Sequence, residues 1–103
     1  MKRTKHGKPD GNQNRIIADL RRAGYSVQPI TAVNNSCDLI VGSPDKSRTE
    51  LIEVKNDTYC TNIRHMDQDQ RTKFLTDGER KFHELFKVWI VINAEEIIKI
   101  FES

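Results

Sequence analysis

The stretch CDLIV at residues 37–41, followed after a turn-rich gap by LIEVK at residues 51–55, decides the fold of this chain. Both runs have the apolar and β-branched character of buried strands, and residues 42–49 between them contain the Gly, Ser, Pro and Asp typical of a hairpin turn. Asp38, Glu53 and Lys55 interrupt these apolar runs. Because burying an unpaired charge costs several kcal/mol or more, about what a small domain's stability can absorb, such residues indicate a bound cation and a reaction.

The rest of the chain supplies helices and strands on both sides of this hairpin. The expected elements, in order, are helix 12–23, strand 25–30, strand 37–41, strand 50–54, a helix opened by the capping-box pattern of residues 76–79, strand 88–92, and a final helix capped by Asn93. The order α-β-β-β-α-β-α predicts an α/β fold with a mixed sheet and flanking helices. Strand 88–92 is apolar on both faces, which predicts a place in the sheet interior. Residues 56–74 are polar and irregular, as functional loops often are.

Composition predicts one globular domain at residues 12–103, preceded by a flexible basic arm at residues 1–11. The chain has 103 residues, and its hydrophobic fraction of 36% is enough for a core. No stretch reaches the roughly 18 apolar residues of a membrane span, and the N-terminus lacks the apolar segment of a secretory signal, so a cytoplasmic location is expected. Two cysteines, without metal-ligand spacing, favour neither a disulfide framework nor a zinc site.

The net charge of the chain is small, but its positive charge is concentrated at the N-terminus. The formal net charge is only +2, but Lys5 and Lys8 belong to a run of basic residues in the first eight positions. Such an arm commonly contacts phosphates, and its contribution falls with salt. A solvated end of the chain is the equally weighted alternative.

The spacing of the charged residues predicts a metal site. Side chains alternate along a strand, so Glu53 and Lys55 point to one face. If Val41 pairs with Glu50, Asp38 lies opposite Glu53 on that same face. Two carboxylates then lie within reach of one divalent ion, and oxygen ligands with open water positions favour Mg²⁺ or Mn²⁺.

Two neighbours complete the expected site. The ammonium of Lys55 can contact the attacking water and the scissile phosphate, and the backbone carbonyl of Val54 is a candidate third metal ligand. Two structural alternatives stay open: an E-x-K triplet is common on solvated edge strands, and Asp38 could form a structural ion pair with Lys55.

At these residues the chain resembles the PD-(D/E)XK nuclease superfamily, and most closely the small stand-alone VRR-NUC proteins typical of phages. The motifs are CDLIVG at 37–42, similar to P-D-L-x-V-G; LIEVK at 51–55, which matches L-x-E-V-K; and the LRRAG ending of the first helix at 20–24. Leu75, Thr76, Glu79 and the pair Phe82-His83 resemble the family's L-T-P-x-Q-x-x-F-H helix opening, although Asp77 and Glu79 replace its Pro and Gln. The resemblance covers nearly all of the chain from Asp10 onward, and it implies a restriction-endonuclease-like fold.

The resemblance also implies roles for individual residues. Asp38 and Glu53 would bind the metal, Lys55 would be the catalytic lysine, and Gln13 would stand where the superfamily often has a glutamate that helps hold the metal or its water. A neutral Gln13 predicts weaker metal affinity. Glu79 is interpreted first as a helix cap. Arg15 is expected to contact phosphate. Residues 58–73 have no firm counterpart in the family, and they are expected to form either a DNA-contacting loop, with the basic residues Arg64, Arg71 and Lys73, or a dimer element.

The predicted function is therefore a Mg²⁺- or Mn²⁺-dependent DNA endonuclease acting on a Holliday junction or other branched DNA. Relatives of this size act as homodimers, which the resemblance extends to this chain, in a host cytoplasm if the protein is phage-encoded. Two other classes stay open: a nucleic-acid-binding module with a vestigial site, and a protein that engages a host nuclease or repair complex.

Overall fold

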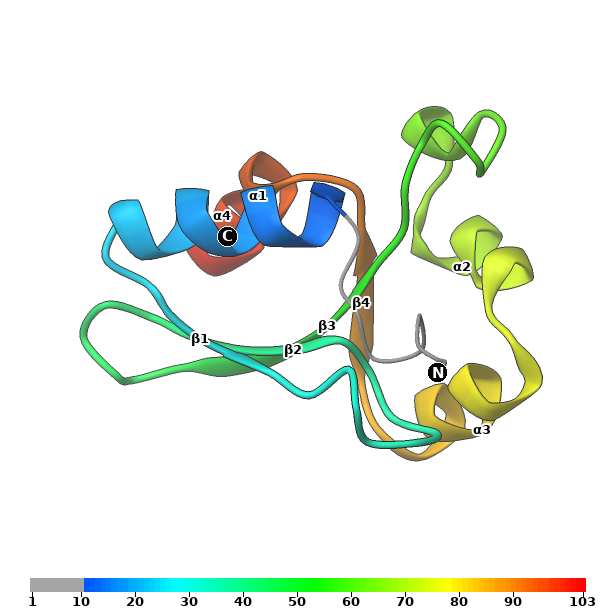
Figure 1. Cartoon of the computed structure of the whole chain (residues 1–103), viewed down its shortest axis with the longest axis horizontal. Coiled ribbons are helices and arrows are strands. Elements are labelled where there is room, and N and C mark those ends of the chain that lie inside the picture. Colours follow the sequence, from blue (N-terminus) through cyan, green and yellow to red (C-terminus); the bar gives the residue numbers. More distant parts are fainter. Residues whose placement is uncertain (1–10) are drawn as a thin grey trace, which may run out of the picture.

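The computed structural model describes residues 11–103, which form a four-stranded sheet of order β1-β2-β3-β4 with helices beside it (Figure 1). The strands are β1 (Ser26–Pro29), β2 (Leu39–Gly42), β3 (Thr49–Val54) and β4 (Val88–Val91). The first three strands are antiparallel, and β4 runs parallel to β3. This mixed sheet with flanking helices confirms the predicted fold class and element order.

One face of the sheet is covered by α1 (Gly11–Arg22) and α4 (Ala94–Glu102) (Figure 1). Helix α1 turns a stripe of apolar residues at helical spacing toward the strands, which is why it packs there. Gly24 ends the turn that follows, with a φ of 97°, a left-handed value that glycine adopts without a Cβ clash. The core on this face consists of Ile16, Ile17, Leu20, Val27, Leu39, Val41, Ile52, Val54, Val91, Ala94 and Ile97.

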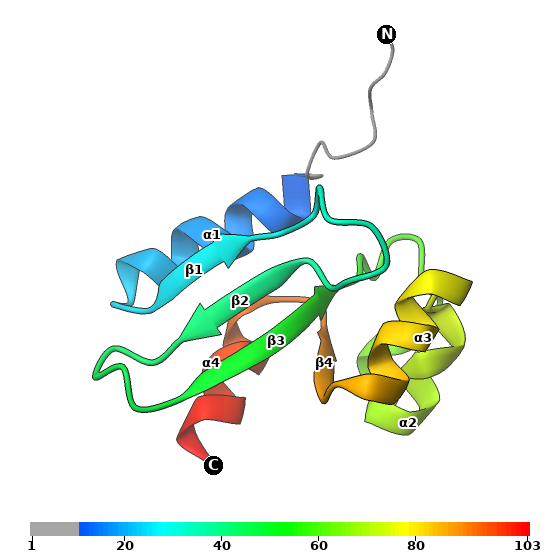
Figure 2. The same ribbon diagram turned by 90° about the horizontal axis from the view of Figure 1, so that it is seen from below.

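The opposite face of β4 is covered by the segment that joins β3 to β4. A second core forms there from Cys60, Ile63, Leu75, Ile90 and Ile92. Side chains alternate along a strand, so Ile90 faces this core while Val91 faces the first. In Figure 2, α2 and α3 stand beside β4, and the face of β1, β2 and β3 opposite α1 carries no helix.

The prediction of irregular structure for residues 56–74 was wrong in part. The segment holds three short helices before α3 (Asp77–Leu85): η1 (Ile63–His65), α2 (Gln68–Arg71) and η2 (Thr72–Phe74). Asp67 and Gln70 form a capping box at the start of α2, a signal present in the sequence as D-x-x-Q. The buried Ile63 and Leu75 hold the segment against β4.

The prediction that the strand at 88–92 lies in the sheet interior was also wrong, because β4 is an edge strand. Its outward backbone groups are bonded by side chains instead of by a fifth strand. The Gln68 amide accepts from Ile90 N at 2.8 Å and donates to Ile90 O at 3.0 Å, as a neighbouring peptide group would. Glu96 accepts from Ile92 N at 3.0 Å. An edge strand covered in this way carries the same apolar sequence as an interior one.

The other edge of the sheet, β1, is blocked by different means. Arg21 donates to the carbonyl of Val27 at 2.8 Å, and Pro29 has no N–H to offer.

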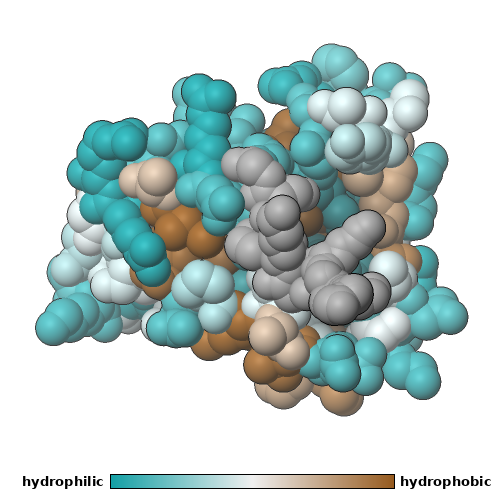
Figure 3. All heavy atoms as spheres, viewed as in Figure 1, coloured by the Kyte–Doolittle hydropathy of each residue, from teal (hydrophilic) through white to brown (hydrophobic). Residues whose placement is uncertain are grey.

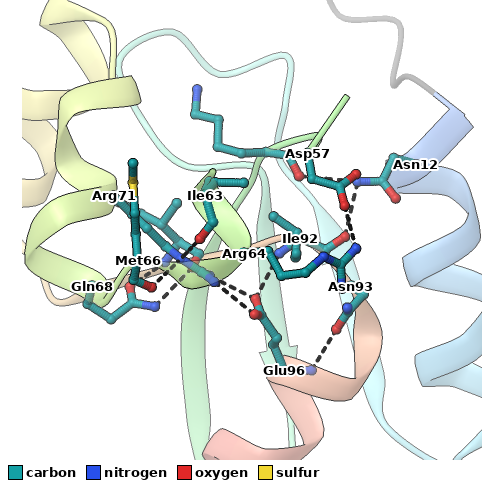
Figure 4. Close-up of polar contacts among 12 residues, drawn as sticks. Asn12, Asp57, Ile63, Arg64, Met66, Gln68, Arg71, Ile92, Asn93 and Glu96 are labelled. Carbon is teal, nitrogen blue, oxygen red and sulfur yellow. Dashed lines mark hydrogen bonds and ion pairs between the residues drawn. The ribbon is translucent and has the colours of Figure 1, made fainter. Parts of the chain in front are cut away.

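Arg71 ties the second core to both β4 and α4 (Figure 4). Its guanidinium is 4% exposed and donates to the carbonyls of Ile63, Met66 and Ile90. It also forms a bidentate ion pair with the Glu96 carboxylate, at 2.8 and 2.9 Å. Each of the three guanidinium nitrogens is thus hydrogen-bonded inside the protein, so the prediction that Arg71 contacts nucleic acid is corrected.

Hydrophilic residues cover much of the face drawn in Figure 3, with hydrophobic residues visible between them. No helix within residues 11–103 has the length and apolar character needed to cross a membrane.

Candidate active site

The predicted charged residues come together at the ends of β2 and β3. Val41 pairs with Glu50, which meets the condition for the predicted placement, and this register sets Asp38 opposite Glu53. The Asp38 carboxylate accepts the N–H of Val54 at 2.7 Å, which fixes it against β3. Lys55 Nζ lies 3.6 Å from Glu53 Oε2, so both side chains point to one face. The predicted convergence of Asp38, Glu53 and Lys55 is therefore present.

A fourth residue, Glu79, joins this cluster from the start of α3. Its Oε1 accepts from Lys55 Nζ at 3.0 Å and from Thr76 N at 2.9 Å, while Thr76 accepts from Glu79 N. The helix-cap interpretation is confirmed, but it is incomplete because the same carboxylate holds Lys55. Sequence reasoning missed that second contact. The one sequence signal for the contact with Lys55 is that the Thr76–Glu79 capping box lies in the stretch that resembles the nuclease helix-opening motif.

Burial and mutual repulsion shape the charge of the cluster. Glu53 is 3% exposed, and its burial, followed by the charges of Asp38 and Glu79, raises the pKa of its carboxyl to about 10. Burial also raises the pKa of Asp38, although the Val54 N–H and the Glu53 carboxyl oppose this rise. At neutral pH the Glu53 carboxyl is therefore protonated, and a cation bound beside Asp38 and Glu53 would relieve the same repulsion.

Lys55 is charged in this setting. Burial alone would lower the pKa of its ammonium, but Glu53 and Glu79 outweigh burial and raise it. Burial likewise raises the pKa of Glu79, yet the Thr76 N–H and the Lys55 ammonium hold it below its ordinary value. The cluster thus contains an ion pair, Lys55–Glu79, next to two carboxyl groups, Asp38 and Glu53, whose pKa values are both raised.

The donors fit a hard divalent cation only as a partial set. The carboxylates of Asp38 and Glu53 come from facing strands. The Val54 carbonyl lies on the side of β3 that faces β2, as does the Val54 N–H that contacts Asp38. Such a set leaves several positions for water, which Mg²⁺ usually retains. Within residues 11–103 no group of three or more His, Cys, Asp or Glu side chains has the arrangement of a metal site.

Gln13 reaches the rim of the cluster through Thr31. Its side chain is 5% exposed and donates to Thr31 Oγ1 at 2.8 Å. Thr31, Asp38 and Glu79 line a common hollow of about 200 Å³ between the loop at residues 31–36 and the start of α3. A hollow of this size has room for several water molecules.

The other predicted residues lie apart from the cluster. Arg15 and Arg64 line a cleft at the ends of β3 and β4, and Arg64 pairs there with Asp57. Lys73 is exposed, with its ammonium over the ring of Phe74. Lys5 and Lys8 lie outside the described residues, as does most of the predicted basic arm. Cys37 and Cys60 are both buried free thiols.

No protein-family model, no curated protein and no solved structure matches this chain. The nuclease resemblance is carried by the chain's own motifs. The structural alternative of an Asp38–Lys55 ion pair is weakened, because the Lys55 ammonium pairs with Glu53 and Glu79.

Proposed function

We propose that this protein is a divalent-metal-dependent DNA endonuclease that hydrolyses phosphodiester bonds. The observation that carries the proposal is the convergence of Asp38, Glu53 and Lys55 on one face at the ends of two paired strands. Apolar strands that carry two carboxylates and a lysine toward one point are costly to keep without a ligand. Raised carboxyl pKa values beside a hollow are typical of such a site.

In this proposal each residue has a distinct task. Asp38, Glu53 and the Val54 carbonyl would hold Mg²⁺ or Mn²⁺, which when bound supplies Lewis acidity and a more acidic water. The Lys55 ammonium stabilises the negative charge that gathers on the phosphate in the transition state. Glu79 keeps that ammonium in place, at 3.0 Å, and Gln13 orients a water at the rim.

Substrate geometry and assembly follow from the resemblance. Branched DNA, including a four-way junction, is the proposed substrate. A chain with one such cluster cuts two strands symmetrically only as a two-fold dimer, so a homodimer is part of the proposal.

The test is a cleavage assay with the purified full chain. Labelled four-way junctions and matched linear duplexes are incubated with Mg²⁺, Mn²⁺ or EDTA. Cleavage that requires metal and is lost in Asp38→Ala and Lys55→Ala, but kept in the control Glu84→Ala on the exposed side of α3, supports the proposal. An intact substrate under all metal conditions contradicts it, and so does equal cleavage by Asp38→Ala.

One observation favours a second candidate, a nucleic-acid-binding module without catalysis. Lys55 is already paired with Glu53 and Glu79, so the cluster balances much of its charge without a metal. Strongly salt-dependent DNA binding with no metal-dependent cleavage would assign this function instead.

A further inference from the structure

A cleft of about 400 Å³ lies at the ends of β3 and β4, apart from the hollow at Asp38 and Glu79. Its walls come from α1, from the segment after β3 and from the start of α4. The polar residues that line it include Asn12, Arg15, Asp19, Asp57, Arg64 and Glu95.

The cleft occupies the position where the chain leaves two parallel strands in opposite directions. After β3 the chain passes to the face that holds Ile63 and Leu75, and after β4 it passes to the face that holds Ala94 and Ile97. Ligands of open α/β sheets bind in the crevice outside the C-terminal ends of strands at such a switch point. The topology thus marks the cleft independently of its lining.

Asn12 joins the cleft to the candidate active site (Figure 4). Its amide donates to the carbonyl of Lys55 at 3.2 Å and to the carbonyl of Ile92 at 3.3 Å. One wall of the cleft is therefore bonded directly to the residue that carries the catalytic ammonium.

The charges of the cleft cancel. Asp57 is paired with Arg64, and Asp19 is paired with Arg22 at 2.9 Å. Of the lining residues this leaves Arg15 and Glu95, which have opposite signs. The lining itself has three acids and two bases, and Arg22 beside Asp19 brings the total to balance, so neither a phosphate nor a cation is favoured. The lining instead favours a neutral ligand with both hydrogen-bond donors and acceptors.

We propose that this cleft binds an unpaired nucleobase of the nucleic-acid substrate, adjacent to the bond cut at Lys55. This inference rests on the proposed function and names its substrate as DNA with a base outside the duplex. A base edge carries donors and acceptors that guanidinium, carboxylate and amide groups recognise. The Watson–Crick edge and the faces of a base are occupied by pairing and stacking inside a duplex, so only a displaced base can offer them to the cleft. Ile16 and Ile92 supply apolar contact for its ring.

The first test is an NMR titration of the full chain without metal, using free nucleosides and inorganic phosphate as probes. Nucleosides are expected to shift the side-chain resonances of Asn12 and Arg15, and phosphate is not. Shifts with phosphate and none with nucleosides would overturn the inference.

The second test is DNA binding in EDTA, with 2-aminopurine placed either at a bulge or within a perfect duplex. We expect Arg15→Ala to weaken binding of the bulged DNA about tenfold, which corresponds to the loss of one good base contact, and to leave duplex binding unchanged. Lys99→Ala, which removes an equal charge from an exposed position outside the cleft, is the matched control. Equal weakening on both DNAs would refute base binding. Because these readouts need no cleavage, an inactive enzyme and an empty cleft give different results.

Discussion

Arg71 is expected to be the most sensitive polar residue for stability. Replacing it by alanine removes the donors to three carbonyls and both bonds to Glu96. Breaking a buried ion pair by removing one partner costs about 3–5 kcal/mol. The Met66 carbonyl also loses its donor, at about 1 kcal/mol, whereas the Ile90 carbonyl keeps the Gln68 amide and the Ile63 carbonyl keeps the Met66 N–H. Small domains are stable by only about 5–15 kcal/mol, so Arg71→Ala should lose a large share of its stability.

Urea unfolding followed by the fluorescence of Trp89, the single tryptophan, measures this loss. Arg64→Ala is the matched control, because Arg64 is exposed and its pair with Asp57 should contribute less than about 1 kcal/mol. A loss for Arg71→Ala no greater than that for Arg64→Ala would refute the reasoning that this buried network holds the 56–75 segment to the sheet.

The cluster gives three further predictions. Glu79→Gln should keep the helix cap, and hence the urea midpoint, but lower the cleavage rate, because Lys55 loses a charged partner. Thr76→Ala keeps that partner, so it should cost about 1 kcal/mol of stability and leave the cleavage rate nearly unchanged. The raised pKa of Glu53, about 10, means that its contribution to stability is complete below the ordinary value of 4.5 and is lost as pH rises toward 10. Urea unfolding at pH 5, 7 and 9 should show this decline in stability, and Mg²⁺ should reverse it. Glu53→Gln should abolish both the pH dependence and the response to Mg²⁺. A response of Glu53→Gln to Mg²⁺ would contradict the assignment of Glu53 as a metal ligand. Burial alone would raise the pKa of Glu96, but Arg71 and the Ile92 N–H hold it below 4.5. The contribution of Glu96 to stability is therefore present above pH 4.5 and is lost as pH falls through the lowered pKa. Acid unfolding should show that loss in the wild type and not in Arg71→Ala.

Periodicity and capping chemistry account for what could be predicted. The apolar stripe of α1, the Thr76–Glu79 capping box and the hairpin between β2 and β3 all depend on neighbours close in sequence, so local patterns reveal them. The Val41–Glu50 register entered only as a condition, and strand alternation then predicted the approach of Asp38 to Glu53.

Long-range packing accounts for what could not be predicted. An apolar strand has the same sequence whether a strand or the side chains of Gln68 and Glu96 complete its edge, so the place of β4 was not evident. An arginine in a polar segment resembles a phosphate contact until Ile63, Met66 and Ile90 are seen to converge on it. The second role of Glu79 likewise depends on the approach of α3 to Lys55, 24 residues away in sequence.

The Gln68 side-chain amide, which occupies the free edge of β4, affects how copies of this protein can associate. A foreign β-strand that approached β4 would find the N–H and C=O of Ile90 taken, and at β1 it would meet Arg21 and Pro29. Continuous sheets that run from one molecule into the next are thereby disfavoured, and with them fibrous aggregation. A two-fold pair of these molecules must therefore be built from helices, loops or the bare face of the sheet.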